Sequence, residues 1–283
     1  MGAVGAIILI RIHAILAGNP LVTYIRDFYR YECLKYRRFP NDLKESEDIN
    51  GAYYVCEDSR LKPKYSNCIV LSFGLYPNDI FDEAINKDLN CIVHSMDPHN
   101  QPSRVKELRK LKSNVINEVS LKINQNWIFH SIGITDKRKI KILNQTGWLD
   151  TYENILNYLV LEEKLIDVLK IDTEGAEWKF LTHIMSKNPD LLCKYVKQLA
   201  IETHPQLDTR DTHQNYKILK SLEVCFRLYK RDHRFQIASG VNDKSEWLKK
   251  NFQLSLKNFK TEINLSRFLF LYGKLYFVNI NFL

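Results

Sequence analysis

Residues 166–178 read IDVLKIDTEGAEW, and the rest of the chain is organised around them. The first six form a short, largely apolar run, as in a buried strand, and a helical pattern begins at Ala176. An acid and a glycine separate the two patterns, which predicts a strand that leads into a helix. Ligands of α/β proteins bind at the carboxyl ends of such strands, so we expect Asp172, Glu174 and Glu177 at the rim of a site. Alternatively, one acid complements the helix dipole and the others are solvated.

Strand and helix patterns alternate from residue 67 onward, which predicts parallel strands covered by helices. We expect strands over 68–73, 91–95, 127–132, 166–171, 196–201, 226–229 and 275–280, and helices over 79–87, 103–111, 152–161 and 213–223. A basic hairpin is expected over 137–143. The expected fold class is therefore α/β, with a seven-stranded, mostly parallel sheet, helices on both faces and the last strand at an edge.

Length and composition predict one main domain with an N-terminal extension. The chain has 283 residues, of which 45% are hydrophobic and 26% charged, as in ordinary globular proteins. We expect an apolar leader over 1–20, a helical extension over 21–65 and the main domain over 66–283. From Gly2 the leader has nine uncharged residues before Arg11, which is short for a membrane span of about 20 residues. It is interpreted as a signal peptide or weak membrane anchor, with a buried or interfacial helix as the alternative.

The six cysteines contain no CxxC pair and no Cys/His spacing of a zinc site. Cys68, Cys91 and Cys225 lie in or beside apolar runs, where we expect free thiols that pack as small hydrophobes. Cys33 and Cys56 lie in the extension and can form a disulfide if the chain is secreted. The compartment is expected to be secretory or membrane-associated if the leader is real, and cytoplasmic otherwise.

The net charge is +8, from 41 Lys and Arg against 33 Asp and Glu, which permits an acidic partner. The basic clusters are dispersed along the chain, so we expect solvated faces and not a nucleic-acid stripe. The oligomeric state is left open by the sequence. Sequence motifs also exclude several enzyme classes, because the chain has no GxSxG, no HExxH and no P-loop.

Short motifs recur in order on both sides of residues 170–178, KIDTEGAEW. They are CIVLSFG (68–74), VHSMDP (93–98), FHSIG (129–133), QLAIETH (198–204), FRLY (226–229) and LYFVN (275–279). Together they resemble the FkbM-type methyltransferases, in particular the animal methyltransferase-like branch, over roughly residues 66–283. The resemblance implies a class I methyltransferase, Rossmann-like fold with S-adenosyl-L-methionine as cofactor. It also implies O-methylation, and we expect a small hydroxylated or glycan-like acceptor.

The expected cofactor site lies after the first, second and fourth strands. Its residues are Gly74, Asn78, Asp79, Asp97, Pro98, Asp172 and Glu174. Asp97 follows Gly74 by 23 residues, a spacing that suits an acid on the ribose hydroxyls. Alternatively, Asp97 only forms a turn with Pro98.

The loop after Gly74 departs from the family pattern. Where the family carries a second glycine, this chain has Tyr76, followed by Pro77. Both changes oppose close approach of the backbone to a ligand, because tyrosine adds a side chain and proline removes a donor. Either the loop is rebuilt or cofactor binding is reduced or lost, and a degenerate binding module is therefore the alternative to an enzyme.

For the transfer itself we expect catalytic roles for His204, Asp172 and Glu202. His204 is the candidate general base, since a histidine with a pKa near neutrality suits removal of a hydroxyl proton. Asp172 is expected to meet the substrate or the amino-acid tail of the cofactor. The same residues with Glu174 also offer ligands for a divalent cation. The resemblance does not require a metal, so no metal is expected.

Overall fold

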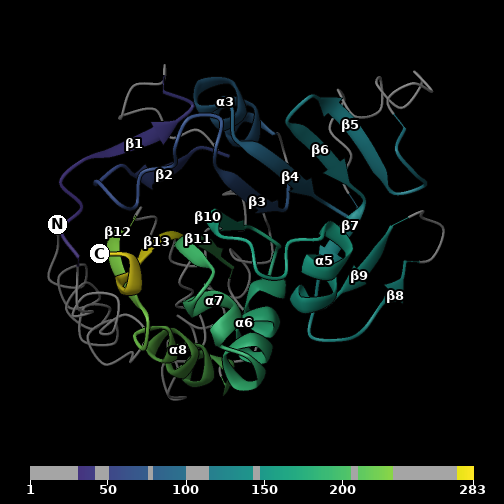
Figure 1. Ribbon diagram of the computed structural model, residues 1–283. Coiled ribbons are helices and arrows are strands. Elements are labelled where there is room, and N and C mark those ends of the chain that lie inside the picture. Colours follow the sequence, from purple (N-terminus) through teal and green to yellow (C-terminus); the bar gives the residue numbers. More distant parts are fainter. Residues whose placement is uncertain are drawn as a thin grey trace, which may run out of the picture.

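The computed structural model describes residues 31–41, 51–75, 79–99, 115–142, 147–204, 210–231 and 273–283. These residues form a mixed α/β fold around one large, mostly parallel sheet (Figure 1). The expected helix over 103–111, the leader over 1–20 and the residues Tyr76, Pro77 and Asn78 lie outside the described residues. Within the described part of the chain, no helix combines the length and apolar character needed to cross a membrane.

The central sheet has eight strands in the order β12-β13-β11-β10-β3-β4-β6-β5. They are β3 (Ile69–Phe73), β4 (Ile92–Met96), β5 (Ser120–Asn124), β6 (Trp127–His130), β10 (Ile166–Ile171), β11 (Val196–Thr203), β12 (Phe226–Arg231) and β13 (Gly273–Asn279). Neighbours from β6 to β11 pair in parallel, whereas β13 is antiparallel to β11 and β12. Every residue of β10 and β11 is buried, as expected for parallel strands that are covered on both faces.

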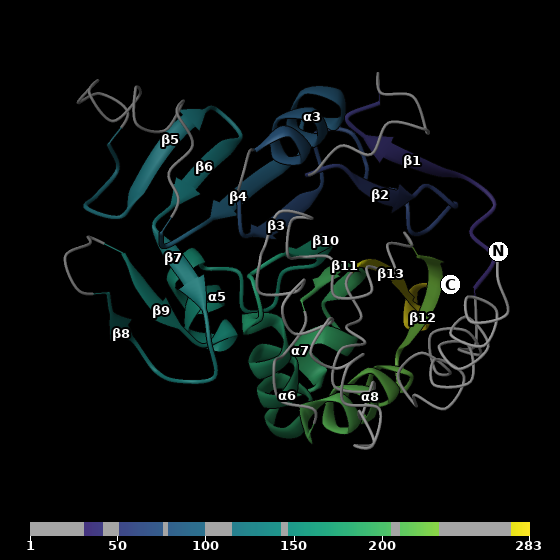
Figure 2. The same cartoon turned by 180° about the vertical axis from the view of Figure 1, so that it is seen from behind.

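Described helices cover both faces of this sheet (Figures 1 and 2). The helices are α3 (Ile80–Leu89), α5 (Tyr152–Leu159), α6 (Ala176–Lys187), α7 (Asp190–Cys193) and α8 (Arg210–Leu222), and a 3-10 turn, η3 (Ile280–Phe282), ends the chain. α3 packs on one face in a cluster with Val70, Val93 and Val168, and the other helices pack on the opposite face. In α6 the buried Trp178, Leu181 and Ile184 repeat every three residues, so one side of the helix meets the sheet.

The sheet differs from the seven-stranded expectation at both ends. β5 adds an eighth strand, because residues 120–124 fold back on β6 as an antiparallel hairpin. The last strand was expected at an edge, but β13 lies between β11 and β12. The expected strand over 127–132 also ends at His130, and the chain then enters a separate sheet. That sheet pairs β7 (Ile132–Ile134) with β9 (Trp148–Asp150), and β9 with β8 (Ile140–Lys141).

The described part of the N-terminal extension is a β-ribbon and not the expected helix. β1 (Tyr36–Phe39) and β2 (Tyr53–Cys56) pair antiparallel, and all four residues of β2 are buried. Tyr53 and Val55 join the apolar cluster that contains α3. Gln198 of β11 clamps the ribbon, since its side chain accepts from the Cys56 N–H at 2.8 Å and donates to the Cys56 carbonyl at 3.0 Å. The ribbon therefore packs as part of the main domain.

All six cysteines are paired in disulfides. The bonds are Cys33–Cys56, Cys68–Cys91 and Cys193–Cys225. The first confirms the pairing considered for the extension. The expectation of free thiols at Cys68, Cys91 and Cys225 is wrong, because their partners, distant in sequence, are brought beside them by neighbouring strands and helices.

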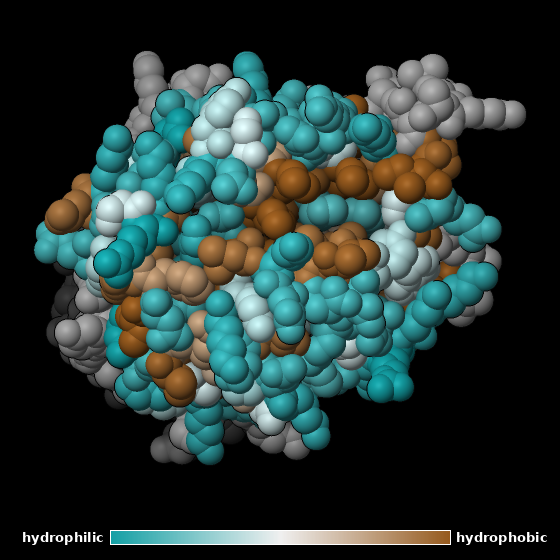
Figure 3. Space-filling view, in the orientation of Figure 1, coloured by the Kyte–Doolittle hydropathy of each residue, from teal (hydrophilic) through white to brown (hydrophobic). Residues whose placement is uncertain are grey.

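The surface is mostly hydrophilic, with hydrophobic residues gathered in a band across the face seen in Figure 3. Large apolar side chains with high exposure include Leu34, Tyr65, Ile116, Val160 and Val224. They come from separate parts of the chain. Exposed apolar side chains are common on folded proteins, so these residues indicate no particular partner.

Candidate functional site

The candidate site lies where β3, β4, β10 and β11 end at one edge of the central sheet (Figure 1). The chain order reverses between β3 and β10, because β4 and β6 lie on one side of β3 while β10 and β11 lie on the other. Ligands of open α/β sheets bind at such a reversal. Gly74, Asp97, Asp172 and His204 each follow directly after one of these four strands. The structure thus gathers four of the predicted site residues at this edge.

Gly74 makes the closest approach between two chain segments at this edge. It leaves β3 with a φ of +84°, and its N–H donates to the Met96 carbonyl at 2.8 Å. A Cβ at this position would lie 1.6 Å from the Asp172 carbonyl oxygen, so only glycine can be accommodated. The Gly74 carbonyl accepts a hydrogen bond from Lys170 Nζ. The glycine is therefore required first of all by its contact with the end of β10.

Asp97 is buried and connects the loops that follow β3 and β4. Its Oδ2 accepts from the Leu75 N–H at 3.0 Å, and its Oδ1 accepts from the His99 N–H at 2.9 Å. The bond to His99 is the turn considered as the alternative, while the bond to Leu75 fixes the start of the loop after Gly74. Its role toward a ribose stays a prediction.

Asp79 and Pro98 lie at the borders of the same region. Asp79 immediately precedes α3 and its side chain makes no capping hydrogen bond to that helix. Pro98 packs against β7, since a Cβ on Gly133 would lie 2.6 Å from Pro98 Cγ. The predicted cofactor roles of these two residues also remain untested.

Carboxylates surround the imidazole of His204. Its Nδ1 lies 3.1 Å from Glu177 Oε1, which also accepts from the His204 backbone N–H at 2.8 Å. Its Nε2 lies 3.5 Å from Glu174 Oε2 and 3.7 Å from Asp172 Oδ1. Asp172, Glu174 and His204 each offer one possible ligand atom, and these three atoms lie within 4.8 Å of one another. The cluster therefore has the composition and spacing to bind a cation.

Glu177 is an internal residue, although its position in the sequence suggested the rim of the site. Its side chain is fully buried, and its Oε2 accepts from the Gly175 N–H at 2.8 Å and from Thr173 Oγ1 at 3.2 Å. It ties the first turn of α6 to the end of β11 through His204. Glu174 is different, because 70% of its side chain is exposed and it reaches the cluster from solvent.

Tyr53 of β2 completes the site, and the sequence analysis missed it. Its hydroxyl lies 2.8 Å from Asp172 Oδ2 and 2.9 Å from Glu202 Oε2, and the residue is fully buried. The ammonium groups of Lys170 and Lys274 lie 5.0 Å and 4.4 Å from the centre of its ring. The one signal in the sequence was Lys170, a lysine inside an apolar strand that needs a buried partner.

The same two lysines partly balance the charges of the carboxylates. Lys170 Nζ lies 3.8 Å from Asp172 Oδ2, and Lys274 Nζ lies 3.6 Å from Glu202 Oε2. Burial raises the pKa of Asp172; the charge of Lys170 opposes that rise, and the charge of Glu202 adds to it. Burial, followed by the charges of Asp172 and Glu202, raises the pKa of the Tyr53 hydroxyl well above its usual value. Tyr53 therefore remains a neutral donor.

The pKa of His204 is not near neutrality, contrary to the prediction. Burial by itself lowers the pKa of His204, but the hydrogen bond to Glu177 and the charges of Glu177, Glu174 and Asp172 outweigh it. Together these effects raise the pKa of His204 to about 9. At neutral pH the ring carries a proton on both nitrogens, so in this state it is a cation and a donor and not a base.

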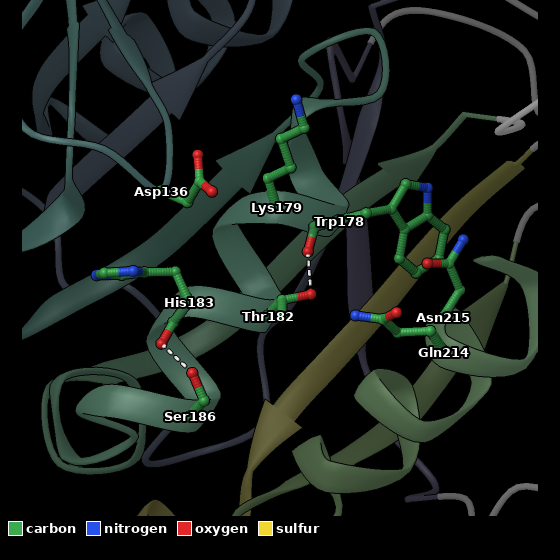
Figure 4. Close-up of a pocket in the computed structure, with 8 residues that line it drawn as sticks. All are labelled: Asp136, Trp178, Lys179, Thr182, His183, Ser186, Gln214 and Asn215. Carbon is green, nitrogen blue, oxygen red and sulfur yellow. Dashed lines mark hydrogen bonds between the residues drawn. The ribbon is translucent and has the colours of Figure 1, made fainter.

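A separate pocket of about 420 Å³ opens between α6 and α8 (Figure 4). It is lined by Asp136, Trp178, Lys179, Thr182, His183, Ser186, Gln214 and Asn215. None of the residues predicted for cofactor binding or catalysis is among them. The pocket is nevertheless connected to the site, because the Trp178 indole N–H donates to the His204 carbonyl at 2.9 Å.

Comparison with known proteins identifies a family. A family model described as a methyltransferase domain matches residues 30–231. The matched region includes the ribbon of β1 and β2 as well as Gly74, Asp97, Asp172 and His204. No curated protein matches the chain.

Proposed function

Since the chain belongs to the methyltransferase-domain family, we propose that it is an S-adenosylmethionine-dependent methyltransferase of class I, Rossmann-like fold. Within this proposal it is an FkbM-type enzyme that methylates a hydroxyl of a small or glycan-like acceptor. The observation that carries the proposal is the gathering of Gly74, Asp97 and Asp172 where the strand order reverses. A dinucleotide oxidoreductase is disfavoured, because Gly74 stands without the other two glycines of that fingerprint.

The residues at this edge have the chemistry that the cofactor requires. S-adenosylmethionine supplies a methyl group activated by a sulfonium cation, and it carries ribose hydroxyls and an amino-acid tail. Asp97, Asp172 and Glu174 are acceptors for hydroxyl and ammonium groups, and their negative charges favour a cation nearby. Gly74 allows these acids to meet, since it turns the chain closely around the end of β10.

The acceptor hydroxyl would lose its proton to Asp172 in this proposal. The raised pKa of Asp172 makes it a stronger base than an ordinary aspartate. His204, protonated at neutral pH, would stabilise negative charge on the acceptor oxygen, and Glu202 would hold Tyr53 and thereby Asp172 in place. Oxygen is favoured over a nucleic-acid amine because residues 172–175 read DTEG and not the Asp/Asn-Pro-Pro-aromatic tetrad.

Three disulfides support folding in an oxidising compartment. Disulfides persist in secreted proteins and are rare in the cytosol, and this chain has no free cysteine. We therefore propose that the protein folds in the secretory pathway. Membrane contact through residues 1–20 remains a prediction, and nucleic acid is not an expected partner.

Calorimetry of S-adenosylmethionine binding to the full chain tests the proposal. We expect micromolar binding by the wild type and at least tenfold weaker binding by Asp97→Asn, which keeps one acceptor oxygen for the backbone. Asp150→Asn is the matched control, because Asp150 is another buried acid whose Oδ1 accepts from backbone N–H groups, of Lys139 and Thr151. It lies in β9, outside the central sheet.

One outcome would contradict the enzyme proposal, and another would contradict the role of Asp97. If folded wild-type protein shows no binding, the alternative of a degenerate module with an altered loop at Tyr76 and Pro77 is favoured. If Asp97→Asn and Asp150→Asn weaken binding equally, the effect is one of general stability and Asp97 is not a ligand.

A further inference from the structure

We propose that Asp172, Glu174 and His204 bind one divalent transition-metal ion, Mn²⁺ or Zn²⁺, at the carboxyl ends of β10 and β11. The three side chains present one nitrogen and two carboxylate oxygens toward a common point, all within 4.8 Å of one another. A second cluster of this kind, Cys33, Cys56 and Asp58, is excluded because both of its thiols are consumed by a disulfide.

The distances match an ion better than they match direct hydrogen bonds. His204 Nε2 lies 3.5 Å from Glu174 Oε2 and 3.7 Å from Asp172 Oδ1, beyond the usual range of N–H···O bonds. Ligand atoms that sit about 2.1 Å from a tetrahedral ion are roughly 3.4 Å from each other. The two His204 distances are thus within a few tenths of an ångström of that spacing, and the three ligand atoms lie within 4.8 Å of one another.

The neighbouring residues orient the ligands as the outer shell of a metal site does. A histidine that binds a metal through one nitrogen usually donates the other N–H to a carboxylate. The fully buried Glu177 makes a hydrogen bond to Nδ1 of His204 at 3.1 Å. This bond orients the ring so that Nε2 faces Asp172 and Glu174. The Tyr53 hydroxyl similarly donates to Oδ2 of Asp172 at 2.8 Å, while Oδ1 faces His204.

The local charge also favours a divalent cation. Four carboxylates meet here, those of Asp172, Glu174, Glu177 and Glu202. Among the described residues, Lys170 lies within 4 Å of Asp172 and Lys274 lies within 4 Å of Glu202, whereas the cation beside Glu174 and Glu177 is His204. Glu177 is fully buried and needs compensating charge, and a divalent ion on His204 Nε2 would add positive charge beside it and beside the exposed Glu174.

The mixed ligand set selects the class of ion. Imidazole suits zinc and other transition metals, carboxylate suits manganese, and calcium prefers six to eight oxygen ligands. The role of the ion rests on the proposed function. Bound to His204 Nε2 in place of that atom's proton, the ion would replace the protonated ring in stabilising negative charge on the acceptor oxygen and would favour deprotonation of the hydroxyl. Metal binding itself can be measured without any acceptor.

The test is a titration of the full chain with Mn²⁺, followed by calorimetry and electron paramagnetic resonance. Mildly alkaline buffer is suitable, because protons compete with metals for imidazole. We expect one ion per chain and a spin-echo signal from one bound nitrogen. Glu174→Gln should weaken binding at least tenfold without disturbing the fold, since 70% of this side chain is exposed. His204→Gln should remove the nitrogen signal, and Glu177→Gln should weaken binding roughly 10–100-fold.

His183→Gln is the matched control, because His183 lies on α6 beside a different acid, Glu153, at 3.6 Å. Its affinity should equal that of the wild type. Millimolar or absent binding by folded wild-type protein would overturn the proposal, as would equal affinity in Glu174→Gln. S-adenosylmethionine binding measured on the same samples separates the two proposals: cofactor binding without metal binding refutes only the metal site. Metal binding without cofactor binding refutes only the enzyme.

Discussion

Replacing Tyr53 with phenylalanine removes one buried oxygen and tests how the ribbon of β1 and β2 holds the site. The hydroxyl lies 2.8 Å from Asp172 and 2.9 Å from Glu202, and both acceptors are buried. A hydrogen bond to a charged group contributes about 1.5–3 kcal/mol, and the variant also removes the hydroxyl that lies between the two carboxylates. We therefore expect Tyr53→Phe to lower the free energy of unfolding by about 3 kcal/mol.

Tyr152→Phe is the matched control for this prediction. Tyr152 is buried to the same degree, but its hydroxyl has no hydrogen-bond partner among the residues that the structure describes. Removing an unpaired buried hydroxyl relieves a desolvation penalty of about 1–3 kcal/mol, so this variant should be neutral or more stable. The same chemical change is thus expected to have opposite effects at the two positions.

Urea unfolding followed by tryptophan fluorescence measures both variants. The slope of free energy against urea should match the wild type, which shows that the compared states are the same. In a thermal scan, 3 kcal/mol corresponds to a midpoint lower by roughly 6–12 °C for a domain of this size. A Tyr53→Phe variant within about 1 kcal/mol of Tyr152→Phe would refute the inference that this hydroxyl holds the two carboxylates together.

Two further predictions concern pH and redox state. Burial lowers the pKa of His94 to about 4, and burial with the charge of His94 lowers the pKa of His130 to about 3. The unfolded chain binds these protons near pH 6.5, so each histidine should lower stability below that pH by up to about 1.4 kcal/mol per unit. Asp82 opposes this fall, because burial raises its pKa to about 6 and the folded chain takes up its proton first. Urea midpoints of the wild type and of Asp82→Asn from pH 7 downward check this, and a variant whose stability does not fall with pH would contradict it. Without reductant, alkylation of denatured protein should label no cysteine, whereas reduction should expose six thiols and remove about 3 kcal/mol per disulfide. Labelling before reduction would show that the bonds are not formed.

Much of the candidate site could be predicted because it is encoded locally. The run from Ile166 to Ile171 and the break at Asp172 indicate where a strand ends, and similar patterns place Gly74, Asp97 and His204 at strand ends. In a parallel sheet such ends share one edge, so their meeting follows from the pattern. The helices α3, α5 and α8 were predicted to within a few residues for the same reason.

Only the tertiary structure decided which distant segments meet. Tyr53 contacts residues 119 and 149 positions further along the chain, and no periodicity in residues 21–65 reveals such a contact. The disulfide pairs Cys68–Cys91 and Cys193–Cys225, the insertion of β13 between β11 and β12 and the carboxylates around His204 likewise depend on packing. Sequence patterns report the local preference of a segment, whereas pKa values and bond partners depend on whichever groups the fold brings within a few ångströms. The sequence by itself therefore determined the positions of the strand ends, and the tertiary structure determined the charges and contacts that surround them.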